Sequence, residues 1–186
     1  RLFHQYHKTF APLNFSDCEA ISRCEQQVPE CFNFASDVLD KWSQIEKERK
    51  GPSNPALWWI NGKEGETKWS FEELGFLSQK VGNVLSGPCS LQRGDRVLVI
   101  LPRIPEWWLL NVACMRTGVI FIPGTTQLTA QDICYRLLAS EAECVTATDG
   151  LAPAVDVVAS KCPFLKTELI VVESSRAEWL NFSDLL

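Results

Sequence analysis

Residues 97–122 read VLVILPRIPEWWLLNVACMRTGVIFI, and this stretch decides the fold class. Its β-branched start, Val97 to Leu101, is typical of a strand that is buried on both faces. A helix over 105–116 follows, with a proline at its start and Gly118 just beyond its end. Val119 to Ile122 has the composition of a second strand. A strand, a helix and a strand in this order predict two parallel strands joined by a crossover helix.

The same alternation continues toward the end of the sequence. Hydrophobic patterning predicts helices over 129–139 and 152–159 and strands over 143–147 and 168–172. Alternating strands and helices are the signature of a parallel sheet with helices on both faces, and its crossovers are right-handed. The predicted fold class is therefore α/β, with a mostly parallel, doubly wound sheet.

An N-terminal helix, a hairpin and a further helix are predicted before this sheet. The first helix covers 34–45, the hairpin strands cover 56–60 and 67–69, and the second helix covers 70–85. The turn dipeptide Asn61-Gly62 lies between the two strands. Ser70 and Glu73 have the spacing of a capping box at the start of the second helix. Residues 48–55 are the linker candidate.

Charge and hydropathy exclude two classes of partner. The 186 residues carry 18 Lys and Arg against 23 Asp and Glu, which gives a formal net charge of -5 and a pI near 5.1. Such an acidic chain lacks the basic surface that binds nucleic acid. Its apolar stretches fall far short of the ~20 residues that span a bilayer, so no transmembrane segment is expected.

Eight cysteines would suit a disulfide framework in a short secreted chain, but their positions favour reduced thiols. They are Cys18, Cys24, Cys31, Cys89, Cys114, Cys134, Cys144 and Cys162. Several lie in apolar-patterned segments, where a free thiol packs as a small hydrophobe. The first three lack the spacing of a zinc site. We therefore expect structural thiols in a reducing compartment.

Residues 1–31 are predicted to form a basic leader and an extended segment. Residues 1–16 contain basic residues, both histidines and no acid, whereas acids are frequent from Asp17 onward. This compositional step resembles the tail of an organelle transit peptide, and a random basic terminus is the alternative. A glycosylation pattern occurs at Asn14 and Asn181, and both are interpreted as chance matches.

The loops at the carboxyl ends of the strands are where a doubly wound sheet binds ligands. The loop Pro123 to Thr129 leads into a helix N-terminus and offers a glycine amide, three hydroxyls and the Gln127 carboxamide. Its backbone amides favour an anion, and Gln127 can both donate and accept, which suits an adenine edge or an amide-containing ligand. The alternative is an ordinary loop capped by Thr129. In the loop after the first strand, Arg103 is expected to close a surface ion pair.

No catalytic residue and no metal site are predicted from the residues. The sequence has no Gly-rich phosphate loop, no nucleophile elbow and no zinc-protease helix motif. Glu73, Glu106 and Asp132 fall in first turns of helices, where the helix dipole explains a carboxylate. The tryptophan pairs at 58–59 and 107–108 are interpreted as core contacts on one side and partner or domain contacts on the other.

Five segments together resemble the medium-chain acyl-CoA synthetases of the mitochondrial matrix, which belong to the adenylate-forming superfamily. They are residues 32–40 (FNFASDVLD), 54–62 (NPALWWING), 91–96 (LQRGDR), 101–108 (LPRIPEWW) and 122–129 (IPGTTQLT). The resemblance identifies residues 32–186 as the N-terminal and incomplete part of the large domain of such an enzyme.

This resemblance implies a ligase that uses ATP, Mg²⁺, CoA and a medium-chain fatty acid. The acid forms an acyl-adenylate with ATP, and the CoA thiol then displaces AMP. The family's phosphate loop, its Tyr-Gly-x-Thr-Glu motif, its nucleotide-holding Asp and Arg and its C-terminal Lys have no matching positions here. This chain by itself is therefore expected to be inactive. Gln127 is similar to a CoA-contacting residue of the family, and localisation in the mitochondrial matrix is implied as well.

Two other functions stay open at this point. The first is a non-catalytic, truncated product that acts as an interaction module and docks the remainder of the domain or a full-length partner through exposed apolar surface. The second is a free-standing nucleotide or CoA binder of the doubly wound class, which would bind CoA without further domains.

Overall fold

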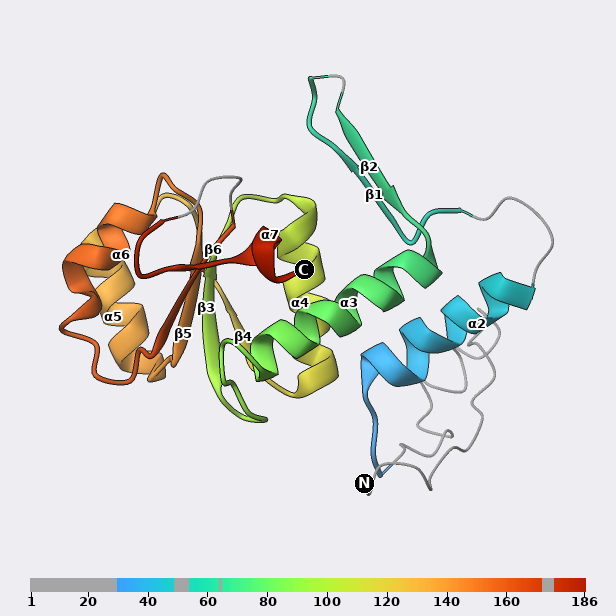
Figure 1. Cartoon of the computed structure of the whole chain (residues 1–186), viewed down its shortest axis with the longest axis horizontal. Coiled ribbons are helices and arrows are strands. Elements are labelled where there is room, and N and C mark those ends of the chain that lie inside the picture. The colour runs from blue at the N-terminus through green and yellow to red at the C-terminus, as the bar shows by residue number, and fades with distance from the viewer. Residues whose placement is uncertain (1–29, 49–53, 64, 172–175) are drawn as a thin grey trace, which may run out of the picture.

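A computed structural model of the chain describes residues 30–48, 54–63, 65–171 and 176–186 (Figure 1). Most of the predicted leader lies outside these residues, with both histidines and the Asn14 pattern, as does most of the linker candidate. None of the described helices is long and apolar enough to cross a membrane.

The larger sheet has five strands, all parallel, in the order β4-β3-β5-β6-β7. The strands are β3 (Arg96–Ile100), β4 (Ile120–Pro123), β5 (Cys144–Ala147), β6 (Thr167–Ile170) and β7 (Leu180–Asn181). The first of them along the chain, β3, pairs with β4 on one side and with β5 on the other. The chain therefore moves outward to β4 and then crosses back over β3 to β5, which confirms the predicted doubly wound sheet.

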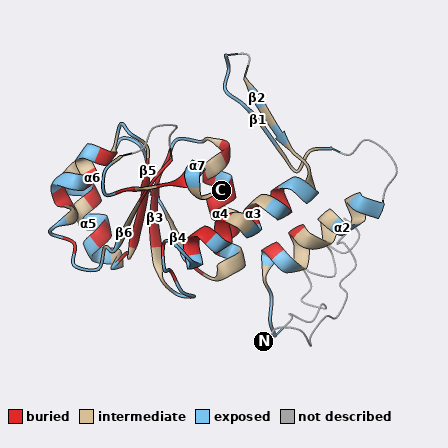
Figure 2. Cartoon of the chain, in the orientation of Figure 1, coloured by how far each residue is buried: buried red, intermediate tan, exposed pale blue. Residues whose placement is uncertain are grey.

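Helices cover both faces of this sheet (Figure 1). Helices α3 (Phe71–Ser86) and α4 (Pro105–Thr117) lie on one face, and α5 (Ala130–Ser140) and α6 (Ala152–Ala159) lie on the other. Val97 and Val99 of β3 enter the core with α3 and α4, whereas Leu98 and Ile100 enter the core with α5 and α6. Figure 2 shows the buried positions between each helix pair and the sheet. Burial on both faces explains why β3 reads as a continuous apolar run.

Side-chain caps begin two of these helices, as predicted. At α3 the Glu73 N–H donates to Ser70 Oγ (3.1 Å), and the Ser70 N–H donates to Glu73 Oε2 (2.8 Å). Thr129 and Asp132 form the same reciprocal box at α5. Helix α4 ends at Gly118, whose φ of 77° lies in the left-handed region that glycine adopts without strain.

The N-terminal helix differs from the prediction in its first turn. It opens as a π-helical segment, η1 (Ala35–Leu39), and continues as α2 (Asp40–Glu48). The Asp40 N–H donates to the carbonyl of Ala35, which closes this wide turn. A π-turn holds one residue more than an α-turn, so a helical period of 3.6 cannot predict it.

The predicted hairpin consists of β1 (Leu57–Ile60) and β2 (Glu66–Trp69), paired antiparallel. Its loop is longer than the Asn61-Gly62 dipeptide. Asn61 Oδ1 accepts hydrogen bonds from the N–H groups of Lys63 (2.7 Å) and Gly65 (3.0 Å), so one side chain closes the loop. The hairpin projects away from the larger sheet (Figure 1).

Two short elements near the C-terminus are missing from the sequence prediction, namely β7 and α7 (Phe182–Leu185). Asn181 joins them and is buried. Its Oδ1 accepts hydrogen bonds from the N–H groups of Ser183 (2.9 Å) and Asp184 (3.3 Å), which caps α7. A two-residue strand has no readable period, so only its pairing with β6 defines it. The Asn-x-Ser pattern at this position is thus used as a helix cap.

Candidate functional site

The carboxyl edge of the parallel sheet is the candidate site, because the chain switches direction there. The loops that leave the adjacent strands β3, β4 and β5 run to helices on opposite faces of the sheet. A doubly wound sheet binds its ligands at such a switch point. The described loops at this edge are residues 101–104 after β3, 124–129 after β4 and 148–151 after β5.

Gly124 fixes the start of the loop after β4. Its N–H donates to the carbonyl of Val99 at 2.8 Å, which extends the pairing of β3 with β4 by one residue. A Cβ atom at this position would lie 3.2 Å from Ile100 Cγ1 and 3.2 Å from Leu128 Cδ1. Glycine therefore lets the loop backbone approach β3 closely, and this contact positions the residues that follow.

Gln127 lies in this loop with an exposed side chain, beside the exposed Thr125 and Thr126. Its backbone N–H donates to Thr125 Oγ1 at 3.4 Å. Within the described part of the chain, no hydrogen bond engages the Gln127 carboxamide, so its donor and its acceptor are both open to a ligand. The structure places Gln127 at the edge where the sequence predicts a binding residue, and its binding role stays a prediction.

Thr129, in contrast, is used by the fold. Its hydroxyl donates to Asp132 Oδ2 at 2.7 Å, and its backbone N–H donates to the same oxygen at 3.0 Å. These two hydrogen bonds, the hydroxyl's first, hold the pKa of the Asp132 carboxyl below its usual value. The interpretation of Thr129 as a helix cap is therefore correct. The Gln127 carboxamide, in contrast, makes no hydrogen bond to the described residues.

Arg103 stacks on an aromatic ring instead of closing the expected ion pair. Its guanidinium carbon lies 4.0 Å from the ring centroid of Trp107, and the Trp107 ring makes an edge contact with Phe121 at 5.2 Å. No carboxylate of the described residues forms an ion pair with Arg103. A cation–π contact gains from the electrostatic attraction of the ring face and needs no counter-charge.

The two tryptophans of each adjacent pair face different surroundings, and the predicted core contact is present at Trp107. Trp107 is buried, whereas Trp108 is 43% exposed. On the hairpin, the half-buried Trp59 donates its indole N–H to the carbonyl of Arg103 at 2.6 Å. Trp58 is 56% exposed, and the Lys68 ammonium lies 4.4 Å from its ring centroid. The hairpin is thus tied to the sheet edge by one of its tryptophans and presents the other outward.

The carboxylates of the described residues do not form a metal centre. No group of three or more His, Cys, Asp or Glu side chains within these residues is arranged to hold an ion. Glu73 and Asp132 serve in caps, and Glu106 lies in the first turn of α4. These positions agree with the predicted dipole and capping roles.

A cleft of about 490 Å³ lies between α2 and α3, away from the sheet edge. Its lining includes Lys47 and Glu72, which form an ion pair at 3.2 Å, and Asp40, which pairs with Arg116. Because these charges are used within the fold, the sheet edge is the better candidate for a ligand site.

Comparisons with known proteins match this chain to one family. Residues 45–185 match the family model described as AMP-binding enzyme. The chain is 61% identical over its whole length to the mitochondrial acyl-coenzyme A synthetase ACSM4 of Mus musculus. It is 58% identical, again over its whole length, to the mitochondrial acyl-coenzyme A synthetase ACSM3 of Homo sapiens. The chain spans 32% of the length of each of these two relatives.

Solved structures share the fold at lower identity. An acyl-CoA synthetase of Brucella canis superposes with a TM-score of 0.71 at 22% identity, covering 92% of this chain and 30% of that one. The anthranilate CoA ligase AuaEII, solved in complex with anthranoyl-AMP, gives a TM-score of 0.70 at 19% identity and covers 85% and 28%. The family model covers most of the present sequence, including the whole βαβ region and the Gln127 loop. The chain therefore belongs to the AMP-binding enzyme family.

Proposed function

We propose that this chain is the N-terminal portion of an AMP-forming ligase of the mitochondrial matrix that joins medium-chain fatty acids to CoA. The observation that carries the proposal is the 61% identity, over the entire chain, to a protein named a mitochondrial acyl-coenzyme A synthetase. The family match supports the use of ATP. The fatty acid and CoA are the two other substrates that such a ligase requires.

The proposed reaction has two steps. A carboxylate oxygen of the fatty acid attacks the α-phosphorus of ATP, and pyrophosphate leaves with the electron pair of the broken P–O bond. The CoA thiol, having lost its proton, then attacks the acyl carbon of the adenylate, and AMP leaves. This chain supplies no group to either step. Its part is to bind, so the 186 residues by themselves are expected to be inactive.

Within this function, Gln127 is proposed to contact CoA. Three features of the structure support this role: the residue lies at the carboxyl edge of the sheet, its side chain is exposed, and its carboxamide is uncommitted among the described residues. CoA carries amide groups and an adenine edge, each with donors and acceptors that a carboxamide can satisfy at once. The contact would orient CoA and would make or break no bond.

Within the described residues, no group of three or more His, Cys, Asp or Glu side chains could hold a metal ion, and none of these residues is assigned to Mg²⁺. The nucleotide chemistry is therefore assigned to no residue of this chain, and no step is derived through the metal.

The deciding experiment combines the full coding sequence and intact mass with an assay of ATP–pyrophosphate exchange in the presence of a medium-chain acid. Exchange is expected from a chain that contains the missing motifs and not from residues 1–186. Exchange clearly above the blank by residues 1–186 would overturn the assignment of a binding role. A full-length protein with no exchange, which still captures a protein partner, would favour the interaction module.

A further inference from the structure

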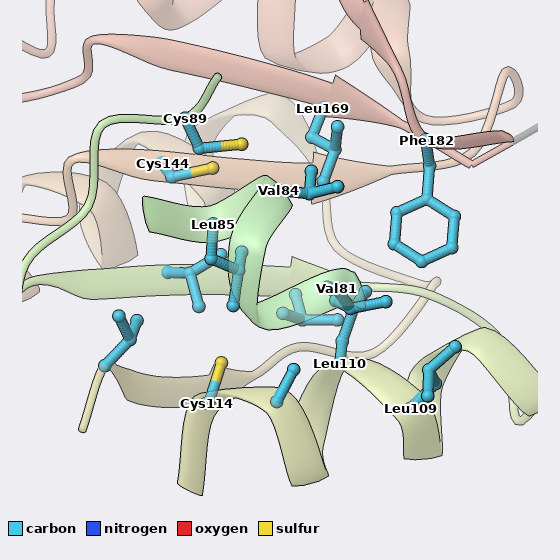
Figure 3. Close-up of a cluster of buried hydrophobic side chains, with 14 of the residues drawn as sticks. Val81, Val84, Leu85, Cys89, Leu109, Leu110, Cys114, Cys144, Leu169 and Phe182 are labelled. Carbon is cyan, nitrogen blue, oxygen red and sulfur yellow. The ribbon is translucent and has the colours of Figure 1, made fainter. Parts of the chain in front are cut away.

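Cys89 and Cys144 bring two thiols together in the core between the sheet and helices α3 and α4. Cys144 is the first residue of β5, and Cys89 lies in the turn that follows α3. Both side chains belong to the same buried cluster, and the Cys144 thiol donates to the carbonyl of Val145 at 3.8 Å. Figure 3 shows the two sulfur atoms next to one another, with the Cys114 sulfur on α4 further off. Cys89 is 2% exposed and Cys144 is fully buried.

The two thiols of this pair are not equivalent. The neighbouring Cys144 side chain lowers the pKa of Cys89, and burial opposes this effect. The same contact with Cys89, together with burial, raises the pKa of Cys144 well above its usual value. Cys89 therefore ionises first while Cys144 keeps its proton. A thiolate beside a protonated partner thiol is the arrangement from which a sulfenic acid is resolved into a disulfide.

The turn that carries Cys89 borders the solvent. Pro88 and Ser90, on either side of Cys89, are both exposed. Ser90 has a φ of 54°, in the left-handed region that a non-glycine residue adopts at a cost. The Cys89 N–H donates to the carbonyl of Val84 at 3.0 Å, and the Cys89 carbonyl accepts from Thr167 Oγ1 on β6 at 3.4 Å. The proposed reaction requires a local opening of this turn that breaks these hydrogen bonds.

We propose that Cys89 and Cys144 form a reversible disulfide when the protein meets hydrogen peroxide. The Cys89 thiolate attacks one peroxide oxygen, the O–O bond breaks, hydroxide leaves and Cys89 becomes a sulfenic acid. The Cys144 sulfur then attacks the Cys89 sulfur, the S–O bond breaks, and the hydroxyl leaves as water with the Cys144 proton. Two thiols are oxidised, and one peroxide is reduced. The new bond ties the end of α3 to the central strand β5.

Two internal controls are present in the chain. Cys114 lies in the same core, and burial raises its pKa to about 12, so it is expected to remain a thiol. Cys162 lies near Cys134 on α5, and burial first and Cys134 second raise the pKa of Cys162 to about 11. Because burial raises the pKa of Cys114 and of Cys162, both thiols are expected to react later than Cys89.

The test uses residues 1–186 with Cys18, Cys24 and Cys31 replaced by Ser, treated with hydrogen peroxide and then alkylated. The expected product has lost about two hydrogen masses, recovers them with dithiothreitol, and yields a cross-linked peptide that contains Cys89 and Cys144. Cys114, Cys134 and Cys162 are expected to be alkylated after unfolding. A cross-link at Cys134 and Cys162 that forms first, or one that contains Cys114, would overturn the proposal. So would no cross-link at all.

A conservative variant keeps the test decisive. Cys89→Ser leaves Cys144 on β5 unchanged, so the circular dichroism spectrum of the variant is expected to match that of the parent. This variant should lose no hydrogen mass at the peroxide dose that converts the parent. If it loses the same mass at the same rate, Cys89 is not the reactive thiol.

Discussion

Arg116 on α4 holds Asp40 on α2 through two parallel hydrogen bonds, from Nη1 to Oδ2 at 2.8 Å and from Nη2 to Oδ1 at 2.7 Å. The same guanidinium donates to Ser78 Oγ on α3 from Nε at 3.3 Å and from Nη2 at 3.0 Å. One side chain therefore joins three helices. Helix α2 has no buried residue of its own. This bidentate ion pair is therefore a main contact that holds the N-terminal helix against α4.

Asp40→Asn is expected to lower the free energy of unfolding of residues 1–186 by about 1–2 kcal/mol, since it removes a charge-assisted pair and keeps the side-chain shape. Lys47→Ala is the matched control. Its ion pair with Glu72 joins side chains that are 50% and 55% exposed, so a loss of about 0.5 kcal/mol or less is expected. Urea unfolding measures both changes, and equal losses would contradict the anchoring role of Asp40.

Gln127→Ala in the complete ligase is expected to raise the KM for CoA by about 3- to 10-fold, the cost of one or two neutral hydrogen bonds. The KM for ATP should stay nearly constant, because the proposed contact is with CoA. Gln131→Ala, at an exposed position on α5, is the control and should change neither constant. Equal increases in both KM values for Gln127→Ala would remove the assignment.

Asn181→Ala is expected to destabilise residues 1–186 by about 1 kcal/mol, because the N–H groups of Ser183 and Asp184 lose their acceptor. Ser183→Ala destroys the glycosylation-like pattern and keeps the cap, so its thermal midpoint should match that of the parent. If Ser183→Ala lowers the thermal midpoint and Asn181→Ala does not, the Asn181 cap does not stabilise the fold.

Thr129→Val is expected to raise the pKa of Asp132 toward the usual value of about 4, because the hydroxyl donor to the carboxylate is gone. A lowered pKa in the folded state stabilises the fold above the pKa of the unfolded chain, and this stabilisation is lost as the pH falls through the folded value. The difference in the free energy of unfolding between the parent and Thr129→Val should therefore be largest above about pH 5 and should decrease below about pH 4.

The measurement for Asp132 is an NMR titration of its carboxyl, paired with urea unfolding at several pH values. Thr126→Val is the control, since Thr126 is an exposed residue of the same loop and Asp132 receives its hydrogen bonds from Thr129. A difference that stays constant with pH would mean that Thr129 acts only by accepting the Asp132 N–H.

The elements that the sequence predicts correctly depend on interactions between near neighbours. The box of Ser70 and Glu73 joins residues three apart, so its two hydrogen bonds are readable as a spacing. The apolar run of β3 records burial on both faces, and Gly118 marks the end of α4. The Gln127 loop is found by the same reasoning, because a loop after a parallel strand has a predictable place at the sheet edge.

Other features required the folded structure, whatever the separation of their residues along the chain. The π-turn before Asp40, the pairing of β7 with β6 and the stacking of Arg103 on Trp107 leave no period or motif in the sequence. The strand order is of the same kind, since it depends on which way each crossover turns.

By itself, the sequence determined the class of fold, its helix caps and the position of its candidate loop, because capping hydrogen bonds join residues three apart and burial repeats along each element. Only the tertiary structure decided that Arg116 meets Asp40 and that Cys144, among several buried thiols, lies against Cys89. Each such contact is set by the packing of whole elements against each other, and spacing along the chain does not encode it.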